Sequence, residues 1–283
     1  MEYQEDYLKR LQACGMQASD YSFVNLWGWA KEYGLEWAWT DAIVWIRQTM
    51  PKSLYWAPIC QWDAINWQHL LSSKPYHFVR IPEQLLSIWK NQLGNQIVSK
   101  SERGQWDYLY SINELATLKG NRFHKKKNLV NQFKKNYHYT YVNLGKQYID
   151  EVIAMQEDWC NWRDCESFYT LASENRSISR VLKYWDKLKN ITGGVLLVDH
   201  LIVAYTVAEL FNQQSVIIHF EKGCPSYKGI YQAINQLFIQ TLTNDYQIVN
   251  REQDVNDDGL RKAKLSYHPV SYVKKYQVKF NQS

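Results

Sequence analysis

Residues 193–223, GGVLLVDHLIVAYTVAELFNQQSVIIHFEKG, decide the fold of the second half of the chain. Three apolar runs are separated by Asp199-His200 and by the polar residues 212–214, and short polar turns between apolar runs predict three antiparallel strands. The other elements expected here are helices at 148–163 and 173–189, a helix beginning near Gly229 and a strand at 246–250. The order is therefore helix, helix, three antiparallel strands, helix, strand, and a short helix and a strand follow.

The first half of the chain has the pattern of a mixed α/β domain that is rich in hairpins. Residues 19–34 predict an amphipathic helix with Ser19 or Asp20 as its N-cap and Gly34 as its stop. The next stretch, LEWAWTDAIVWIRQ, alternates on both sides of a turn at Thr40-Asp41 and predicts a hairpin. We expect an α+β protein of two mixed α/β units.

The composition is that of a globular protein with a mild positive charge. The chain has 283 residues, of which 46% are hydrophobic and 22% charged, and its net charge is +5. This length allows one or two domains, and we expect two, at 1–140 and 141–283. The charge suits an anionic partner, but it does not by itself indicate DNA binding.

The five cysteines show neither a disulfide framework nor zinc spacing. They are Cys14, Cys60, Cys160, Cys165 and Cys224, and this odd set without a CxxC pair favours reduced thiols. A polar N-terminus and the lack of a long apolar run predict a cytoplasmic protein with no signal peptide and no transmembrane segment. We expect no metal, because no metal-binding motif occurs.

Two stretches carry unusual charge. In residues 118–137, LKGNRFHKKKNLVNQFKKNY, helical spacing puts aromatic and aliphatic side chains on one face and lysines on the other, and Lys126 falls within the apolar set. Such a lysine either extends its amine to the edge of the apolar face or is held toward an anionic partner. The second stretch, residues 246–269, follows a predicted strand; a solvated loop and a binding site are both open for it.

The order of elements is similar to the GNAT (acyl-CoA N-acyltransferase) fold, in which a helix start receives the phosphates of the acyl donor. The corresponding start here contains Lys228 and Gly229, the candidates for cofactor binding. Acetyl-CoA is therefore one possible donor. The chain has Ser226 and Tyr231 where the acyl-CoA signature has Arg or Gln and a small residue.

The chain also resembles the soluble domain of phosphatidylglycerol lysyltransferases and their stand-alone relatives, which look like two GNAT units in tandem. The residues that carry this resemblance are Gly259-Leu260-Arg261, Lys264, Tyr267 and Pro269, with residues 118–128 and 229–236. The resemblance implies transfer of an aminoacyl group from aminoacyl-tRNA to a hydroxyl or amine acceptor, which is a small molecule or a lipid.

The resemblance also suggests roles for charged and polar residues. Glu252 and Asp254 alternate on an extended chain, and either would hold the amine of the aminoacyl group or act as a general base. Tyr267 is a proton donor or a packing ring under Pro269. The candidates for substrate binding are Lys126, Glu221, Gln232, Asn235, Arg251, Arg261 and Lys264.

Ordinary structural roles stay open for several of these residues. In such roles Arg261 and Lys264 form structural ion pairs with Asp254 or Asp257 and bind no substrate, and Glu221 is a solvated group at the end of a strand. His219, in an apolar strand, is expected to be a core histidine with satisfied nitrogens. Two alternatives to aminoacyl transfer also stay open: an acetyl-CoA-dependent N-acetyltransferase, and a non-catalytic module that binds RNA or another anion.

Overall fold

The computed structural model of the chain describes residues 1–71 and 76–281. It separates into two compact units, each with one β-sheet: Met1–Asp107, Gln253–Arg261 and Tyr272–Ser283 form the first, and Tyr108–Glu252 and Lys262–Ser271 form the second. None of the helices in the described part of the chain has the length and apolar character that a membrane span requires.

The sheet of the first unit has six strands in the order β1-β2-β3-β4-β13-β5. The strands are β1 (Leu35–Trp39), β2 (Val44–Gln48), β3 (Leu54–Tyr55), β4 (His77–Pro82), β5 (Ile97–Ser101) and β13 (Lys275–Phe280). The helices of this unit are α1 (Gln4–Cys14), α2 (Phe23–Tyr33), α3 (Trp67–Leu71) and α4 (Glu83–Leu93). The predicted hairpin is confirmed, because β1 pairs with β2 from Leu35↔Gln48 to Trp39↔Val44.

The predicted N-cap of the first helical segment is wrong. The hydroxyl of Ser22, rather than Ser19 or Asp20, accepts the backbone N–H of Asn25 and caps α2. Ser19 is used elsewhere, since its N–H and hydroxyl both donate to the Asp107 carboxylate at 2.8 and 3.0 Å. The expected stop is confirmed: Gly34 ends α2 in the left-handed conformation.

A buried charge cluster explains why the C-terminal strand returns to the first unit. The Lys275 amine contacts the Asp20 carboxylate and lies 2.6 Å from that of Asp107, and all three side chains are buried. Arg80 also pairs with Asp20, at 2.8 Å. The compact units differ from the domains expected at 1–140 and 141–283, because β13 lies between β4 and β5 of the first unit and residues 108–140 belong to the second.

The sheet of the second unit has seven strands in the order β12-β6-β11-β10-β9-β8-β7. The strands are β6 (Asp107–Ser111), β7 (Tyr139–Asn143), β8 (Ile191–Val198), β9 (Leu201–Leu210), β10 (Ser215–Gly223), β11 (Ile248–Asn250) and β12 (Ser271–Val273). The helices are α5 (Ile112–Thr117), α6 (His124–Asn136), α7 (Ile149–Arg163), α8 (Tyr169–Lys183) and α9 (Ile230–Gln240). Helix α10 (Asp258–Leu265) is divided, since residues 258–261 belong to the first unit and 262–265 to the second. The predicted three-stranded meander is β8, β9 and β10, and it is confirmed.

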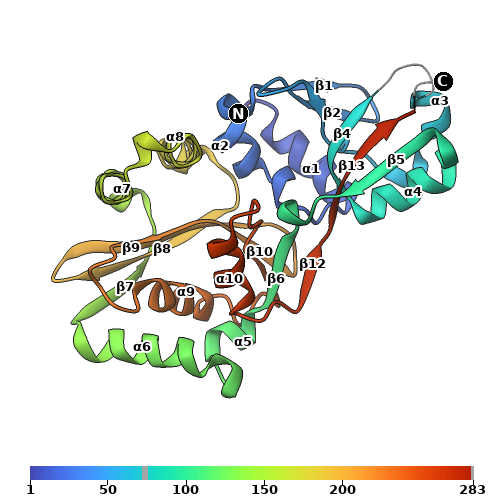
Figure 1. Cartoon of the computed structure of the whole chain (residues 1–283). Coiled ribbons are helices and arrows are strands. Elements are labelled where there is room, and N and C mark those ends of the chain that lie inside the picture. The colour runs from blue at the N-terminus through green and yellow to red at the C-terminus, as the bar shows by residue number, and fades with distance from the viewer. Residues whose placement is uncertain (72–75, 282–283) are drawn as a thin grey trace. The chain divides into compact units, whose positions relative to one another are not determined.

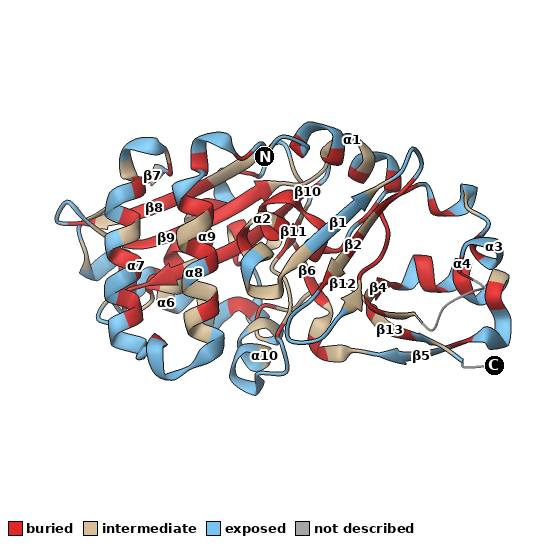
Figure 2. Ribbon diagram, turned by 90° about the horizontal axis from the view of Figure 1, so that it is seen from above, coloured by how far each residue is buried: buried red, intermediate tan, exposed pale blue. Residues whose placement is uncertain are grey.

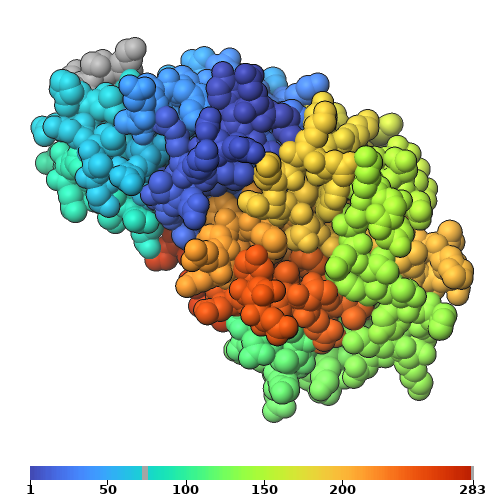
Figure 3. All heavy atoms as spheres, turned by 180° about the vertical axis from the view of Figure 1, so that it is seen from behind, coloured from blue at the N-terminus to red at the C-terminus, as the bar shows by residue number. Residues whose placement is uncertain are grey.

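Helices cover both faces of this sheet. Figure 1 shows α7 and α8 on one side and α5, α6 and α9 on the other. The strands β8, β9 and β10 are almost wholly buried between them (Figure 2). The predicted buried face of α6 is confirmed by Val130 and Phe133, whereas the green atoms of this part of the chain lie at the surface in Figure 3.

The expectation of five reduced cysteines is wrong for one pair. Cys160 and Cys165 form a disulfide. Cys160 lies in the last turn of α7, and Asp164 reverses the chain in the left-handed conformation, so the two Cα atoms come within 5.0 Å. Spacing in the sequence could not show this reversal. The other three cysteines are buried and free.

Candidate active site

The candidate site lies where β10 and β11 separate. The two strands pair in parallel from Ser215↔Ile248 to Ile217↔Asn250, and β10 then continues to Gly223. The register of β10 against β9 shifts between Ile218 and Phe220, which marks a bulge at His219. Bulges bend a strand and redirect its side chains, and they recur beside active sites. The end of β10 can therefore direct polar groups toward the residues that follow β11.

Glu221 and Arg251 meet at this separation. One Arg251 terminal nitrogen, Nη2, donates to the Glu221 carboxylate at 3.0 Å, and the amide of Asn235 on α9 donates to the other carboxylate oxygen at 2.8 Å. The Glu221 side chain is 9% exposed. Burial would lower the pKa of Arg251, but Glu221 and nearby tyrosines raise it, so the guanidinium stays charged.

The second nitrogen of the same guanidinium has no partner. Arg251 Nη1 is buried and makes no hydrogen bond among the described residues. A buried donor without an acceptor costs roughly 1–3 kcal/mol, and more if it is charged. Such an atom is uncommon in a folded protein and needs an explanation. A bound ligand that accepts a hydrogen bond from Nη1 is one such explanation.

Tyr267 lies between two cations. The Arg251 guanidinium carbon is 4.8 Å from the centre of the Tyr267 ring, and the Lys126 amine is 4.3 Å from it. Burial raises the pKa of Tyr267 to about 12, although the charge of Arg251, and after it hydrogen bonds with Gln232 and Arg251, act against this. The hydroxyl therefore keeps its proton at neutral pH and can donate it in a hydrogen bond. Burial and then the charge of Arg251 lower the pKa of Lys126.

His219 holds two carboxylates together. Its Nδ1 lies 2.8 Å from Glu252 and its Nε2 lies 3.2 Å from Glu209, so the expectation of a satisfied core histidine is confirmed. Burial would lower the pKa of His219, but the two carboxylates raise it to about 9. None of the described His, Cys, Asp and Glu side chains form a group of three that could hold a metal ion. Around His219, the Glu252 and Glu209 carboxylates lie at different ring nitrogens, Nδ1 and Nε2.

Lys264 ties α10 to the end of β11. Its amine donates to the backbone carbonyl of Arg251 and lies 3.5 Å from that of Glu252. The hydroxyl of Tyr110 donates to the Lys264 carbonyl at 2.9 Å. These bonds fix the backbone that follows the Arg251 side chain. In this structure Lys264 thus positions the site residues.

Asp254 and Arg261 belong to the first compact unit. Arg261 binds both oxygens of the Asp254 carboxylate, at 2.8 and 2.9 Å, and Arg103 adds a contact at 3.3 Å. The Asp254 side chain is wholly buried. This is the ion-pair role that the sequence left open for Arg261, and it leaves Asp254 shielded from solvent.

Lys228 and Gly229 form the start of α9, which packs on α6. The backbone N–H of Lys228 donates to the hydroxyl of Tyr137 at 3.3 Å. Gly229 has φ +85°, and a Cβ atom there would lie 2.3 Å from the carbonyl oxygen of Leu129. This close approach explains the need for glycine without any bound phosphate.

The structure thus gathers most of the predicted residues in one unit. The group around the β10–β11 separation consists of Lys126, Glu221, Gln232, Asn235, Arg251 and Tyr267, with Glu252 and Lys264 at its border. The hydrogen bond between His219 and Glu252 was not predicted from the sequence. It depends on the bulge at His219, and no residue pattern in the sequence indicates that bulge.

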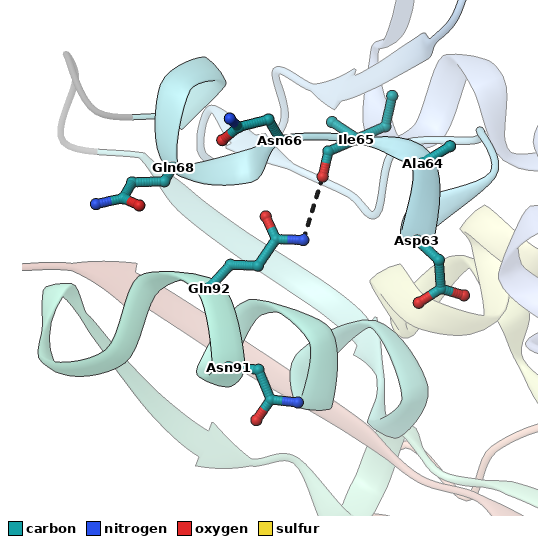
Figure 4. Close-up of a pocket in the computed structure, with 7 residues that line it drawn as sticks. All are labelled: Asp63, Ala64, Ile65, Asn66, Gln68, Asn91 and Gln92. Carbon is teal, nitrogen blue, oxygen red and sulfur yellow. Dashed lines mark hydrogen bonds between the residues drawn. The ribbon is translucent and has the colours of Figure 1, made fainter.

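A separate surface hollow of about 500 Å³ lies in the first unit. Figure 4 shows its lining, which is mostly amide side chains, and Gln92 donates across it to the carbonyl of Ile65 at 3.2 Å. Its residues are Asp63, Ala64, Ile65, Asn66, Gln68, Asn91 and Gln92. The hollow contains none of the predicted site residues.

Solved structures define the class of the fold. A conserved protein of unknown function from Bacteroides thetaiotaomicron is 26% identical, with a TM-score of 0.90 over 99% of this chain and 97% of that one. The C-terminal domain of a putative lysylphosphatidylglycerol synthetase from Agrobacterium fabrum is 13% identical, with a TM-score of 0.68 over 98% and 92%. A tandem GNAT protein from the clavulanic acid biosynthesis pathway is 8% identical, with a TM-score of 0.50 over 100% and 96%. The protein has the tandem GNAT-like fold.

The sequence profile described as "Phosphatidylglycerol lysyltransferase, C-terminal" matches residues 12–279. The chain belongs to this family, which places it among acyltransferases of the GNAT-like kind. An uncharacterised protein of Mycoplasmoides gallisepticum is 24% identical over 176 residues, which are 61% of this chain and 56% of that protein. The match thus spans little more than half the length of that relative.

Proposed function

We propose that the protein moves an aminoacyl group from aminoacyl-tRNA to a hydroxyl or amine acceptor. The observation that carries the proposal is the buried group of Glu221, Arg251 and Tyr267 at the β10–β11 separation. It offers a carboxylate that can accept a proton and a neutral hydroxyl that can donate one. Family membership supports this choice, since the family is described as a lysyltransferase.

The reaction needs a base, a donor to the carbonyl oxygen and a fixed geometry. The acceptor oxygen or nitrogen attacks the ester carbonyl carbon while Glu221 takes its proton. Tyr267 donates a hydrogen bond to the oxyanion of the tetrahedral intermediate. The bond to the ribose oxygen then breaks, and the proton held by Glu221 passes to that oxygen, so the carboxylate is restored.

The other predicted residues take supporting roles in this proposal. Asn235 and Arg251 hold Glu221 by its two oxygens, and Gln232 binds the Tyr267 hydroxyl. Glu252 and Lys264 hold the backbone after β11. We assign the proton transfer to Glu221 because Asp254 is wholly buried in its pair with Arg261. The cytoplasmic location stays a prediction.

Transfer from labelled aminoacyl-tRNA tests this proposal. The full chain is incubated with tRNA charged with a mixture of radiolabelled amino acids and with a cell extract, and label is followed into lipid and into small molecules. We expect protein-dependent transfer that Glu221→Gln lowers at least a hundredfold, as loss of a general base does. Lys183→Gln, an exposed change on α8, is the matched control.

Two results would count against aminoacyl transfer. One is the absence of any protein-dependent loss of the aminoacyl ester. The other is consumption of acetyl-CoA with an amine acceptor, which would support the N-acetyltransferase alternative. If Glu221→Gln transfers label as fast as the Lys183→Gln control, Glu221 is not the base.

A further inference from the structure

The positive charge of this protein is concentrated on one segment. Residues 118–137 contain seven Lys and Arg and no Asp or Glu. The other 263 residues contain 26 Lys and Arg and 28 Asp and Glu, a net charge of −2. The whole excess of positive charge therefore belongs to α6 and the turn before it. A local field of this kind attracts polyanions far more than a net charge of +5 spread evenly would.

The outer face of α6 is polar throughout. Val130 and Phe133 are buried on its inner face. Several large hydrophobic side chains of the described chain are exposed, but none of them belongs to residues 118–137. The exposed side chains of the segment are cationic groups, amide groups and one imidazole: Lys119, Asn121, Arg122, His124, Lys125, Lys127, Asn128, Asn131, Gln132, Lys134, Lys135 and Asn136. The helix is about 20 Å long, enough to follow several phosphates of one strand.

Lys126 connects this face to the candidate site. Its amine lies over the Tyr267 ring and has no hydrogen bond or ion pair among the described residues. The Arg251 guanidinium contacts the same ring, and its Nη1 is a buried donor without an acceptor. Two cations thus share one ring, while Glu221 supplies the only carboxylate that binds Arg251 in the described part of the chain. This imbalance favours an anion with oxygen acceptors.

RNA suits this surface better than a lipid bilayer does. A helix that binds a membrane inserts apolar side chains between the lipids, but the apolar face of α6 is already packed in the core. Lysines bind phosphates, and amide side chains bind phosphate and ribose oxygens, which are the groups an RNA strand presents.

We infer that the lysine face of α6 binds an RNA strand, and that Lys126 and Arg251 together bind one phosphodiester of that strand beside Glu221. This inference rests on the proposed function, in which the RNA is the tRNA of the donor. It places the sugar-phosphate backbone along α6 and brings its end to the group that performs transfer.

Binding of uncharged tRNA to the full chain tests the inference without any transfer step. Affinity is measured by fluorescence anisotropy from 0.05 to 0.3 M salt. For Lys125→Gln/Lys127→Gln, loss of two phosphate contacts reduces the slope of log K against log salt by about 1.5 and weakens binding roughly 25- to 60-fold at 0.1 M salt. We expect Lys126→Met to reduce the slope by nearly one and Lys126→Arg to restore it.

The matched control is Lys183→Gln/Lys187→Gln, which removes the same charge elsewhere on the second unit. The inference is overturned if this control weakens binding as much as the α6 pair does. It is also overturned if the α6 pair binds tRNA normally, or if the protein binds phosphatidylglycerol vesicles and no tRNA. Specific tRNA binding without aminoacyl transfer would refute the proposed function and leave the inference standing.

Discussion

Replacement of His219 by glutamine tests the cluster that holds the bulge of β10 against the turn after β11. The ring lies between Glu209 and Glu252, at 3.2 and 2.8 Å, and its side chain is wholly buried. Glutamine is similar in size and its amide NH2 can donate hydrogen bonds, but it cannot carry a positive charge. The variant therefore removes the charge from between two carboxylates with little change in packing.

The pKa of His219 sets the size of the effect. It is raised from 6.5 to about 9 in the folded protein. Because the folded value lies above the unfolded one, the stabilisation is fully present below pH 6.5 and is lost as the pH rises through 9. It amounts to about 3 kcal/mol at pH 6.5 and to less than about 1 kcal/mol at pH 9.

Urea unfolding at pH 6.5 and at pH 9 measures the stabilisation that the charge of His219 contributes. We expect the free energy of unfolding of the wild type, relative to His219→Gln, to fall by 2–3 kcal/mol, on the order given by linkage, between pH 6.5 and 9. His138→Gln, at an exposed position, should show no such difference. An imidazole NMR signal of His219 that titrates near 6.5, or parallel pH profiles for wild type and variant, would refute the reasoning.

Three further changes test the packing around the two sheets. Lys275→Met removes the cation that buried Asp107 and Asp20 share and leaves Asp20 with Arg80, so it should lower the free energy of unfolding by about 3–5 kcal/mol. Lys279→Met on the exposed side of β13 should change it little, and urea unfolding followed by tryptophan fluorescence distinguishes the two variants. Gly229→Ala forces a Cβ against a backbone carbonyl and should lower the melting temperature by several degrees more than Gly15→Ala, where φ is also positive but the space is open. Arg261→Ala should lower the melting temperature by several degrees, because it removes the cation that binds both oxygens of a buried carboxylate and leaves the longer Arg103 contact as the ion pair; an unchanged melting temperature would contradict the structural role.

Local patterns were enough to predict most elements of the fold. The hairpin around Thr40, the meander of β8, β9 and β10, and the start of α9 at Gly229 all follow from alternation and turn residues, which act between neighbours in the chain. The N-cap of α2 could not be found in this way. Ser19 appears suited to it in the sequence, but its side chain bonds to Asp107, 88 residues away.

The sequence predicted only part of the candidate site, because it does not specify which charged groups pair in the folded protein. The sequence left a binding site open for the charged stretch 246–269, and Arg251 of that stretch does meet Glu221 across the β10–β11 separation. The charge pattern could not show which partners each group would choose. Asp254, only three residues after Arg251, turns into the first unit and pairs with Arg261.

By itself the sequence determined the order of elements, the concentration of positive charge on α6 and the residues that resemble the lysyltransferase family. These properties depend on composition and on short spacing, so they are present before the chain folds. Tertiary structure alone decided that β13 lies between β4 and β5, that Cys160 meets Cys165 and that Lys126 shares a ring with Arg251. Such contacts depend on which distant segments pack together, and neither composition nor short spacing specifies that.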